Sequence, residues 1–158
     1  MAAFSQRLVF IAVTAYLVLG LGAGLVYREL TKHADVAQGQ PLQLGVMHTH
    51  LLTLGFIVML IVLALDRLFA LGRHKLFPVF FWVYNAGLLL TVAMMAVQGS
   101  TVLAGGEESP AVAGMAGMGH IIMTIGLLVF VVVLGSAVWR HVPAAAAEHE
   151  TAPEPVER

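Results

Sequence analysis

Charge and cysteine are both scarce in this sequence of 158 residues. Only 11% of the residues are charged, whereas an average soluble domain has about 25%. A chain with so little charge cannot cover its surface with polar groups. Its hydrophobic content of 59% therefore predicts a single membrane domain with several spans, surrounded by lipid. The net charge is close to zero, so no nucleic-acid partner is indicated.

The absence of cysteine excludes several kinds of site at once. Disulfides, thiolate metal sites, iron–sulfur clusters and covalent c-type haem attachment all require cysteine. Any metal must therefore be held by histidine, methionine, carboxylate or backbone oxygen.

Four apolar runs are long enough to cross a bilayer as helices, because about 20 residues span its hydrocarbon core. They cover residues 8–27, 44–65, 76–97 and 111–139. We predict an all-α fold in which residues 1–141 form a four-helix transmembrane domain and residues 142–158 a disordered Pro/Ala/Glu-rich tail. The first run is longer than the 7–15 apolar residues at the centre of a signal peptide, so we expect it to be retained. Asn85, inside the third run, is expected to hydrogen-bond to a neighbouring helix.

The distribution of basic residues predicts the orientation. The loop between the second and third runs holds the basic residues Arg67, Arg73 and Lys75, whereas the loop between the third and fourth runs holds none. Arg7, before the first run, and Arg140, after the fourth, lie on the same side of the membrane as that basic loop. Because short cytoplasmic loops are rich in Lys and Arg, we expect both termini in the cytoplasm and a multi-pass protein of the cytoplasmic membrane. Arg28 and Lys32, in the first loop, are the exceptions.

Three histidines lie inside the apolar runs, where ionisable side chains are costly and mark functional sites. His48 and His50 begin the second run, about 6–9 Å below Leu44 at 1.5 Å per residue. His120, counted back from Trp139, falls at a similar depth in the fourth run. We predict that these three residues bind a cofactor or metal near the outer face. The alternative is that each imidazole only hydrogen-bonds a neighbouring backbone carbonyl.

The spacing of the first two histidines separates them around their helix. Residues i and i+2 of an α-helix are about 200° apart, so His48 and His50 face opposite sides and cannot bind one ion together. Met47 and Met118 lie beside the histidines at the same level. Imidazole pairs suit haem iron, whereas thioether with imidazole suits copper. The alternative to haem is therefore a copper-binding or copper-handling protein, although methionine also fills apolar interfaces.

The segment His48-Thr49-His50, followed by Leu54-Gly55-Phe56, resembles the His-x-His-x-x-x-Leu-Gly-aromatic helix of haem–copper oxidase catalytic subunits, in particular the cbb3-like branch. The whole chain is similar to small four-span membrane proteins of unknown function that share this helix. The resemblance implies haem b ligated by His48 on one side of the helix and by His50 on the other. It also implies a homo-oligomer, with a trimer favoured and a dimer as the alternative, whose haems lie between protomers.

The chain departs from the oxidases in ways that affect the expected function. No cross-linked His–Tyr pair and no three-histidine copper site can be placed, and only Thr53 is polar between His50 and Leu65. Oxygen reduction is therefore not supported, and no residue is assigned a catalytic role. The expected role is electron transfer, or sensing of redox state or a small gas. The sequence does not identify the electron donor or acceptor. Within one protomer, His120 is the alternative partner for one of the two histidines.

Overall fold

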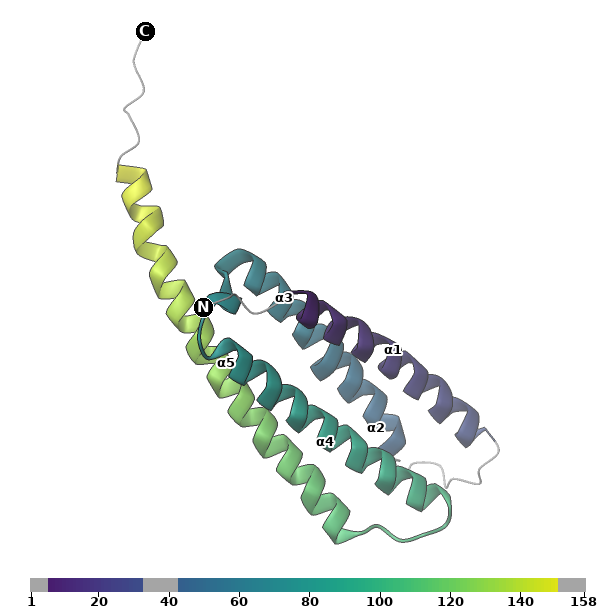
Figure 1. Ribbon diagram of the computed structural model, residues 1–158. Coiled ribbons are helices and arrows are strands. Elements are labelled where there is room, and N and C mark those ends of the chain that lie inside the picture. Colours follow the sequence, from purple (N-terminus) through teal and green to yellow (C-terminus); the bar gives the residue numbers. More distant parts are fainter. Residues whose placement is uncertain (1–5, 33–42, 151–158) are drawn as a thin grey trace.

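The chain folds into a bundle of long helices in the computed structural model, which describes residues 6–32 and 43–150, with side chains through residue 140 (Figure 1). The elements are α1 (Gln6–Thr31), α2 (Gln43–His50), the π-helical segment η1 (Leu51–Ile57), α3 (Val58–Phe69), the 3-10 turn η2 (Leu71–Arg73), α4 (Phe77–Leu103) and α5 (Pro110–Glu150). α2, η1 and α3 follow one another without a break and form a single rod.

Four helical stretches of the described residues are long and apolar enough to cross a membrane. They are Gln6–Thr31, Gln43–Phe69, Phe77–Leu103 and Pro110–Arg140. The predicted all-α fold and the number of spans are therefore confirmed. The spans are longer than predicted at several ends; residues 98–103, expected in a loop, belong to α4. Gln98 tolerates the helical position because its side chain turns inward and bonds the connection to α5.

The four rods pack as two antiparallel pairs (Figure 1). α4 packs along α5, and α1 packs along the rod of α2, η1 and α3. α4 carries the most buried surface of the four, while large apolar side chains such as Phe10, Leu128 and Val131 are exposed on the outside of the bundle. Exposed apolar side chains in such numbers suit contact with lipid chains.

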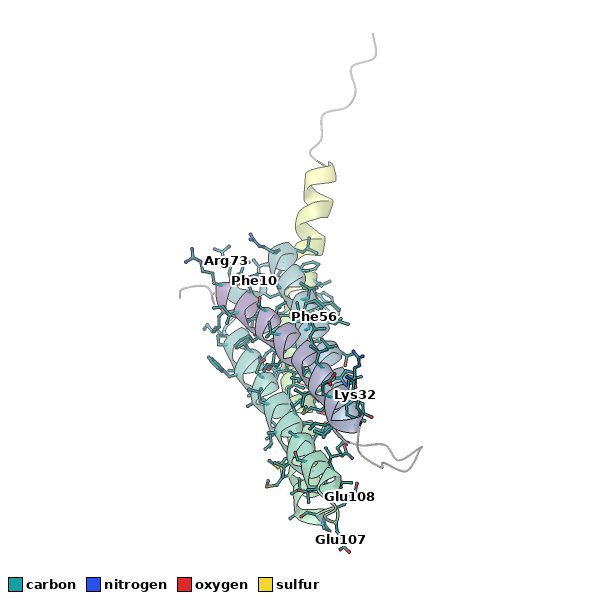
Figure 2. The ribbon with its side chains drawn as sticks, turned by 90° about the vertical axis from the view of Figure 1, so that its right-hand side faces the viewer. Phe10, Lys32, Phe56, Arg73, Glu107 and Glu108 are labelled. Atoms are coloured by element: carbon teal, nitrogen blue, oxygen red, sulfur yellow. The ribbon has the colours of Figure 1, made fainter. Side chains whose placement is uncertain are left out.

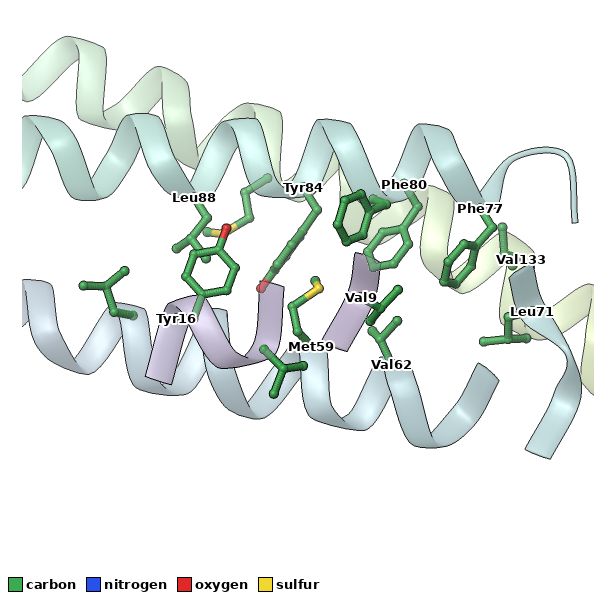
Figure 3. Close-up of a cluster of buried hydrophobic side chains, with 14 of the residues drawn as sticks. Val9, Tyr16, Met59, Val62, Leu71, Phe77, Phe80, Tyr84, Leu88 and Val133 are labelled. Carbon is green, nitrogen blue, oxygen red and sulfur yellow. The ribbon is translucent and has the colours of Figure 1, made fainter. Parts of the chain in front are cut away.

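The core is filled mainly by aromatic residues of α4. Phe77, Phe80 and Tyr84 are almost fully buried and point toward α1 and α3, where Val9 and Met59 meet them (Figure 3). The polar side chains of Tyr16 and Asn85 in this core are paired, which suits an apolar surrounding. The Tyr16 hydroxyl donates to Asn85 Oδ1 at 2.5 Å, and Asn85 Nδ2 donates to the carbonyl of Phe81. The predicted interhelical hydrogen bond of Asn85 is confirmed.

The π-helical segment η1 begins directly after His50. A β-carbon at Gly55 would lie 2.6 Å from the Tyr16 ring, so only glycine lets α1 approach η1 this closely. The carbonyl of Leu54, within η1, accepts a hydrogen bond of 2.9 Å from the Tyr84 hydroxyl of α4. Irregular segments of this kind are frequent at functional sites, and this one follows the two histidines.

Tyr84→Phe is expected to destabilise the bundle, because it leaves the part-buried carbonyl of Leu54 without the hydroxyl that now bonds it. Hydrogen bonds between membrane helices contribute about 0.6 kcal/mol on average and up to about 1.7 kcal/mol. Thermal unfolding in detergent should show a lower Tm for the variant. A Tm equal to that of the wild type would mean that the Tyr84 hydroxyl does not stabilise η1.

The C-terminal region differs from the sequence prediction. Residues 142–150, expected to be disordered, continue α5 as a helix to Glu150. Alanine has the highest helix propensity of any residue type. The alanines at 144–147 therefore favour this extension of the helix. The rest of the predicted tail, 151–158, lies outside the described residues.

Candidate functional site

His48 and His50, in the last turn of α2, face opposite sides of the helix. The His48 ring lies against α1, where it is near Gly24 and stacks toward Tyr27 with ring centroids 6.4 Å apart. The His50 ring instead meets His120 of α5, with ring centroids 5.9 Å apart and planes nearly perpendicular at 89°. The structure thus brings His50 and His120 together and leaves His48 on the other side, as the spacing of about 200° requires.

The rings of His50 and His120 are held in the same way. His50 Nδ1 lies 3.1 Å from the carbonyl of Val46, and His120 Nδ1 lies 2.9 Å from the carbonyl of Ala116. A carbonyl can only accept, so each Nδ1 is the donor and carries hydrogen. In the neutral ring Nε2 then keeps its lone pair. Metal-ligating histidines are commonly oriented by this kind of bond from the other ring nitrogen.

Both rings line a cavity of about 380 Å³ between α2 and α5, with α4 as its floor. α2 and α5 each pack on α4 but hardly touch one another among the described residues. The small side chains of Ala113, Ala116 and Gly117 keep the α5 wall thin. Met94 and Met95 form part of the floor. A volume of this size is within the range of small-molecule sites, about 300–1,000 Å³.

Gln98 contributes an unused hydrogen-bond donor to this cavity. The residue is only 6% exposed, and its Oε1 accepts a bond of 3.2 Å from the Ser109 amide. Its Nε2 is buried and has no hydrogen-bond partner among the described residues. A buried amide nitrogen without a partner is costly, so this position suits a ligand with an acceptor oxygen.

The remaining predicted residues lie elsewhere. Met47 packs against the apolar core, and Met118 is 53% exposed on the outside of α5; neither lines the cavity. His48 Nδ1 is buried between α1 and α2 and has no hydrogen-bond partner in the described part of the chain. A Cβ at Gly24 would be in van der Waals contact with His48, so this ring lies close to the backbone of α1.

Gln98, Met94, Met95 and Glu108 line the cavity but were not assigned to the site from the sequence. A signal for three of them existed: residues 94, 95 and 98 are spaced i, i+1, i+4, which places them on one face of a helix. The spacing does not say which neighbour that face meets. Glu108 lies in the connection before α5, where no periodicity predicts its position.

Comparison with known proteins gives a family without an assigned activity. The family described as "Protein of unknown function (DUF2871)" matches residues 6–137, which is most of the chain, and the chain belongs to that family. No curated protein and no solved structure matches. The expected membership of a small four-span family of unknown function agrees with this match, whereas the likeness to haem–copper oxidases still rests only on the residues quoted above.

Proposed function

We propose that this chain is an integral membrane protein that binds b-type haem between His50 and His120 and serves in electron transfer. The observation that supports the proposal most directly is the pairing of the two imidazoles across one cavity, with each Nδ1 anchored on its own helix. The carbonyls of Val46 and Ala116 hold the two rings in place before any ligand binds, so binding does not have to order these side chains.

The number of available ligands fits haem better than an ion held by protein alone. The described residues contain no group of three or more His, Asp and Glu side chains that could hold a metal ion. A tetrahedral protein site needs three or four such ligands, whereas haem iron takes only its axial ligands from the protein. The ring centroids of His50 and His120 are 5.9 Å apart, so both rings could hold one ligand in the cavity that they line.

A bound haem would supply an iron that gains and loses one electron. If both His50 and His120 held the haem, its iron would serve electron transfer or redox sensing rather than gas binding. Gln98 would assist from the floor of the cavity, where its free Nε2 can donate to an acidic oxygen of the ligand. Charge-assisted hydrogen bonds of this kind are stronger than neutral ones.

Haem between protomers, held by His48 and His50 of adjacent chains, is the competing arrangement. It would require the His48 ring to face a neighbouring chain, but the ring lies against Gly24 and Tyr27 of its own α1. We therefore favour the arrangement within one protomer. A homo-oligomer stays a prediction, and in this arrangement its interface does not have to provide a ligand.

Copper is the second candidate, because Met94 and Met95 line the same cavity as His50 and His120. Thioether sulfur with imidazole nitrogen suits Cu(I). The methionines that support this candidate differ from Met47 and Met118, which the sequence had suggested.

The proposed site lies near the outer face of the cytoplasmic membrane. Arg7 and Arg67 line one cavity, and Arg73, Lys75 and Arg140 line another at the same end of the bundle. Glu107 and Glu108 lie at the opposite end, beside the histidine cavity (Figure 2). Of the two basic exceptions there, Lys32 pairs with Glu29 at 2.7 Å. From the positive-inside rule we infer that the basic end faces the cytoplasm.

The haem and copper content of the purified protein tests this proposal. Full-length protein, extracted in mild detergent, is assayed for haem by the pyridine haemochrome method and for copper by elemental analysis. We expect about one haem b per chain, in line with one histidine pair per chain. Stoichiometric copper in a colourless preparation would establish the second candidate instead. A preparation with neither would overturn both and leave the histidines with a structural role.

A further inference from the structure

We propose that the end of the bundle opposite the histidine cavity binds the phosphate group of an anionic phospholipid. A cavity of about 700 Å³ lies there between α5 and the turn that joins α3 to α4. Its walls combine basic side chains, among them Arg73, Lys75 and Arg140, with the apolar Phe69 and Leu76. This site is independent of the proposed haem.

The charges around this cavity have one sign. Arg73 and Lys75 come from the turn and Arg140 from α5, and no carboxylate lines the cavity. In the described part of the chain, none of the three forms an ion pair with a carboxylate. Asp66, the acidic residue of α3, is only 3% exposed, and its Oδ1 accepts a bond of 2.5 Å from the Gly72 amide. Its carboxylate is therefore directed into the turn, and the three cations are left for a ligand.

The turn that presents Arg73 and Lys75 is fixed by its own hydrogen bonds. Ala70 adopts a left-handed conformation with φ 52°, and its amide donates to the Asp66 carbonyl at 2.9 Å. The Arg73 amide then bonds the carbonyl of Ala70. Figure 2 shows Arg73 extending away from the bundle at this end. Because the backbone is already ordered, binding of an anion does not have to order this turn.

The depth of the cavity identifies the ligand as a lipid. Trp139 is 78% exposed and directly precedes Arg140, and exposed tryptophans concentrate at the level of the lipid headgroups. Arg140 therefore lies where lipid phosphates lie. Nearer the middle of the span, α5 exposes large apolar side chains such as Val132 and Leu128, as a helix in contact with acyl chains does. Basic pockets between membrane helices on the cytoplasmic side bind anionic headgroups in this way.

The test compares lipids on full-length protein in a neutral detergent. Phosphatidylglycerol and phosphatidylcholine are added separately, and bound lipid is counted by native mass spectrometry. We expect phosphatidylglycerol to bind and phosphatidylcholine to bind far more weakly. In the triple variant Arg73→Gln, Lys75→Gln, Arg140→Gln, affinity for phosphatidylglycerol should fall by about 100-fold, since each cation near the surface contributes a factor of about five.

A matched control removes two cations from the other end of the bundle. Arg28→Gln with Lys32→Gln should leave lipid binding unchanged, because neither residue lines the cavity. In the single variant Lys75→Gln, at an exposed position in the turn, affinity for phosphatidylglycerol should fall about five-fold. This variant keeps the test decisive if the triple variant does not fold.

Three results would overturn the proposal. Equal binding of phosphatidylcholine and phosphatidylglycerol would show that the charge of the lipid is not recognised. Equal losses in the cavity variants and in the Arg28/Lys32 control would show that the cavity is not the site. Displacement of the lipid by millimolar inorganic phosphate, with the same loss in the triple variant, would show that the cavity recognises a soluble phosphate and not a lipid.

Discussion

His50→Ala is expected to abolish stable haem binding. The His50 ring supplies one of the two Nε2 atoms available in the cavity, and alanine offers iron no ligand. Loss of an outer-shell partner alone typically costs 10–100-fold in metal affinity, so loss of the ligand itself should cost more than about 100-fold. Haem content and the absorption spectrum of the purified variant measure the effect. His120→Ala should behave in the same way, and the double variant should lose little more than either single variant.

The matched control is His48→Ala, two residues away on the same helix. The His48 ring faces α1, so its removal should leave haem content and spectrum unchanged. Added imidazole should restore a six-coordinate spectrum in His50→Ala, because it can occupy the space of the missing ring. If His120→Ala kept full haem content and an unchanged six-coordinate spectrum, the arrangement within one protomer would be excluded. If His50→Ala did so, the central assignment would be wrong.

Gly87→Ala is expected to weaken the packing of α4 on α5. A β-carbon at Gly87 would lie 2.5 Å from the backbone nitrogen of Met123 and 2.7 Å from the carbonyl oxygen of Gly119. Both neighbours are backbone atoms, which cannot rotate away, so the two helices must separate. Overpacking of this kind costs about 1–3 kcal/mol. Because Gly119 directly precedes His120, we also expect haem content to fall.

Gly114→Ala is the control for this substitution, since it lies on α5 and nothing lies within 4 Å of its added β-carbon. Alanine favours helix over glycine by up to about 1 kcal/mol, so Gly114→Ala should be neutral or stabilising. Thermal unfolding in detergent compares the two variants, and the ratio of haem to protein reports on the site. Equal Tm values for Gly87→Ala and Gly114→Ala would show that close contact of α4 and α5 does not stabilise the bundle.

The spans and the two faces of the second span were predictable because they depend on local properties. Hydrophobic length determines whether a helix can cross a bilayer, and the angle per residue separates His48 from His50. The sequence did not determine whether His50 or His48 lies near His120. A similar depth makes a contact possible, but only the packing of α2 and α5 on α4 brings the rings to 5.9 Å.

Features that depend on contacts between helices could not be predicted. The π-helical segment η1 coincides with the approach of Tyr16 to Gly55 and the bond from Tyr84, both made by other helices. For the glycines of the first span, too, the sequence does not show which of them lie at a close contact between helices. Gly20 meets Leu52 closely and Gly24 lies beside His48, but nothing lies within 4 Å of a β-carbon at Gly22. The composition of a segment does not distinguish these three positions.

The coordination of the iron in the wild-type protein tests the central claim most directly. Electron paramagnetic resonance of the oxidised protein, with a reduced-minus-oxidised absorption spectrum, reports how many imidazoles bind. We predict low-spin, six-coordinate iron with two imidazole ligands, unchanged in His48→Ala and lost in both His50→Ala and His120→Ala. High-spin, five-coordinate iron, or a low-spin signal that depends on His48 and survives without His120, would contradict the account.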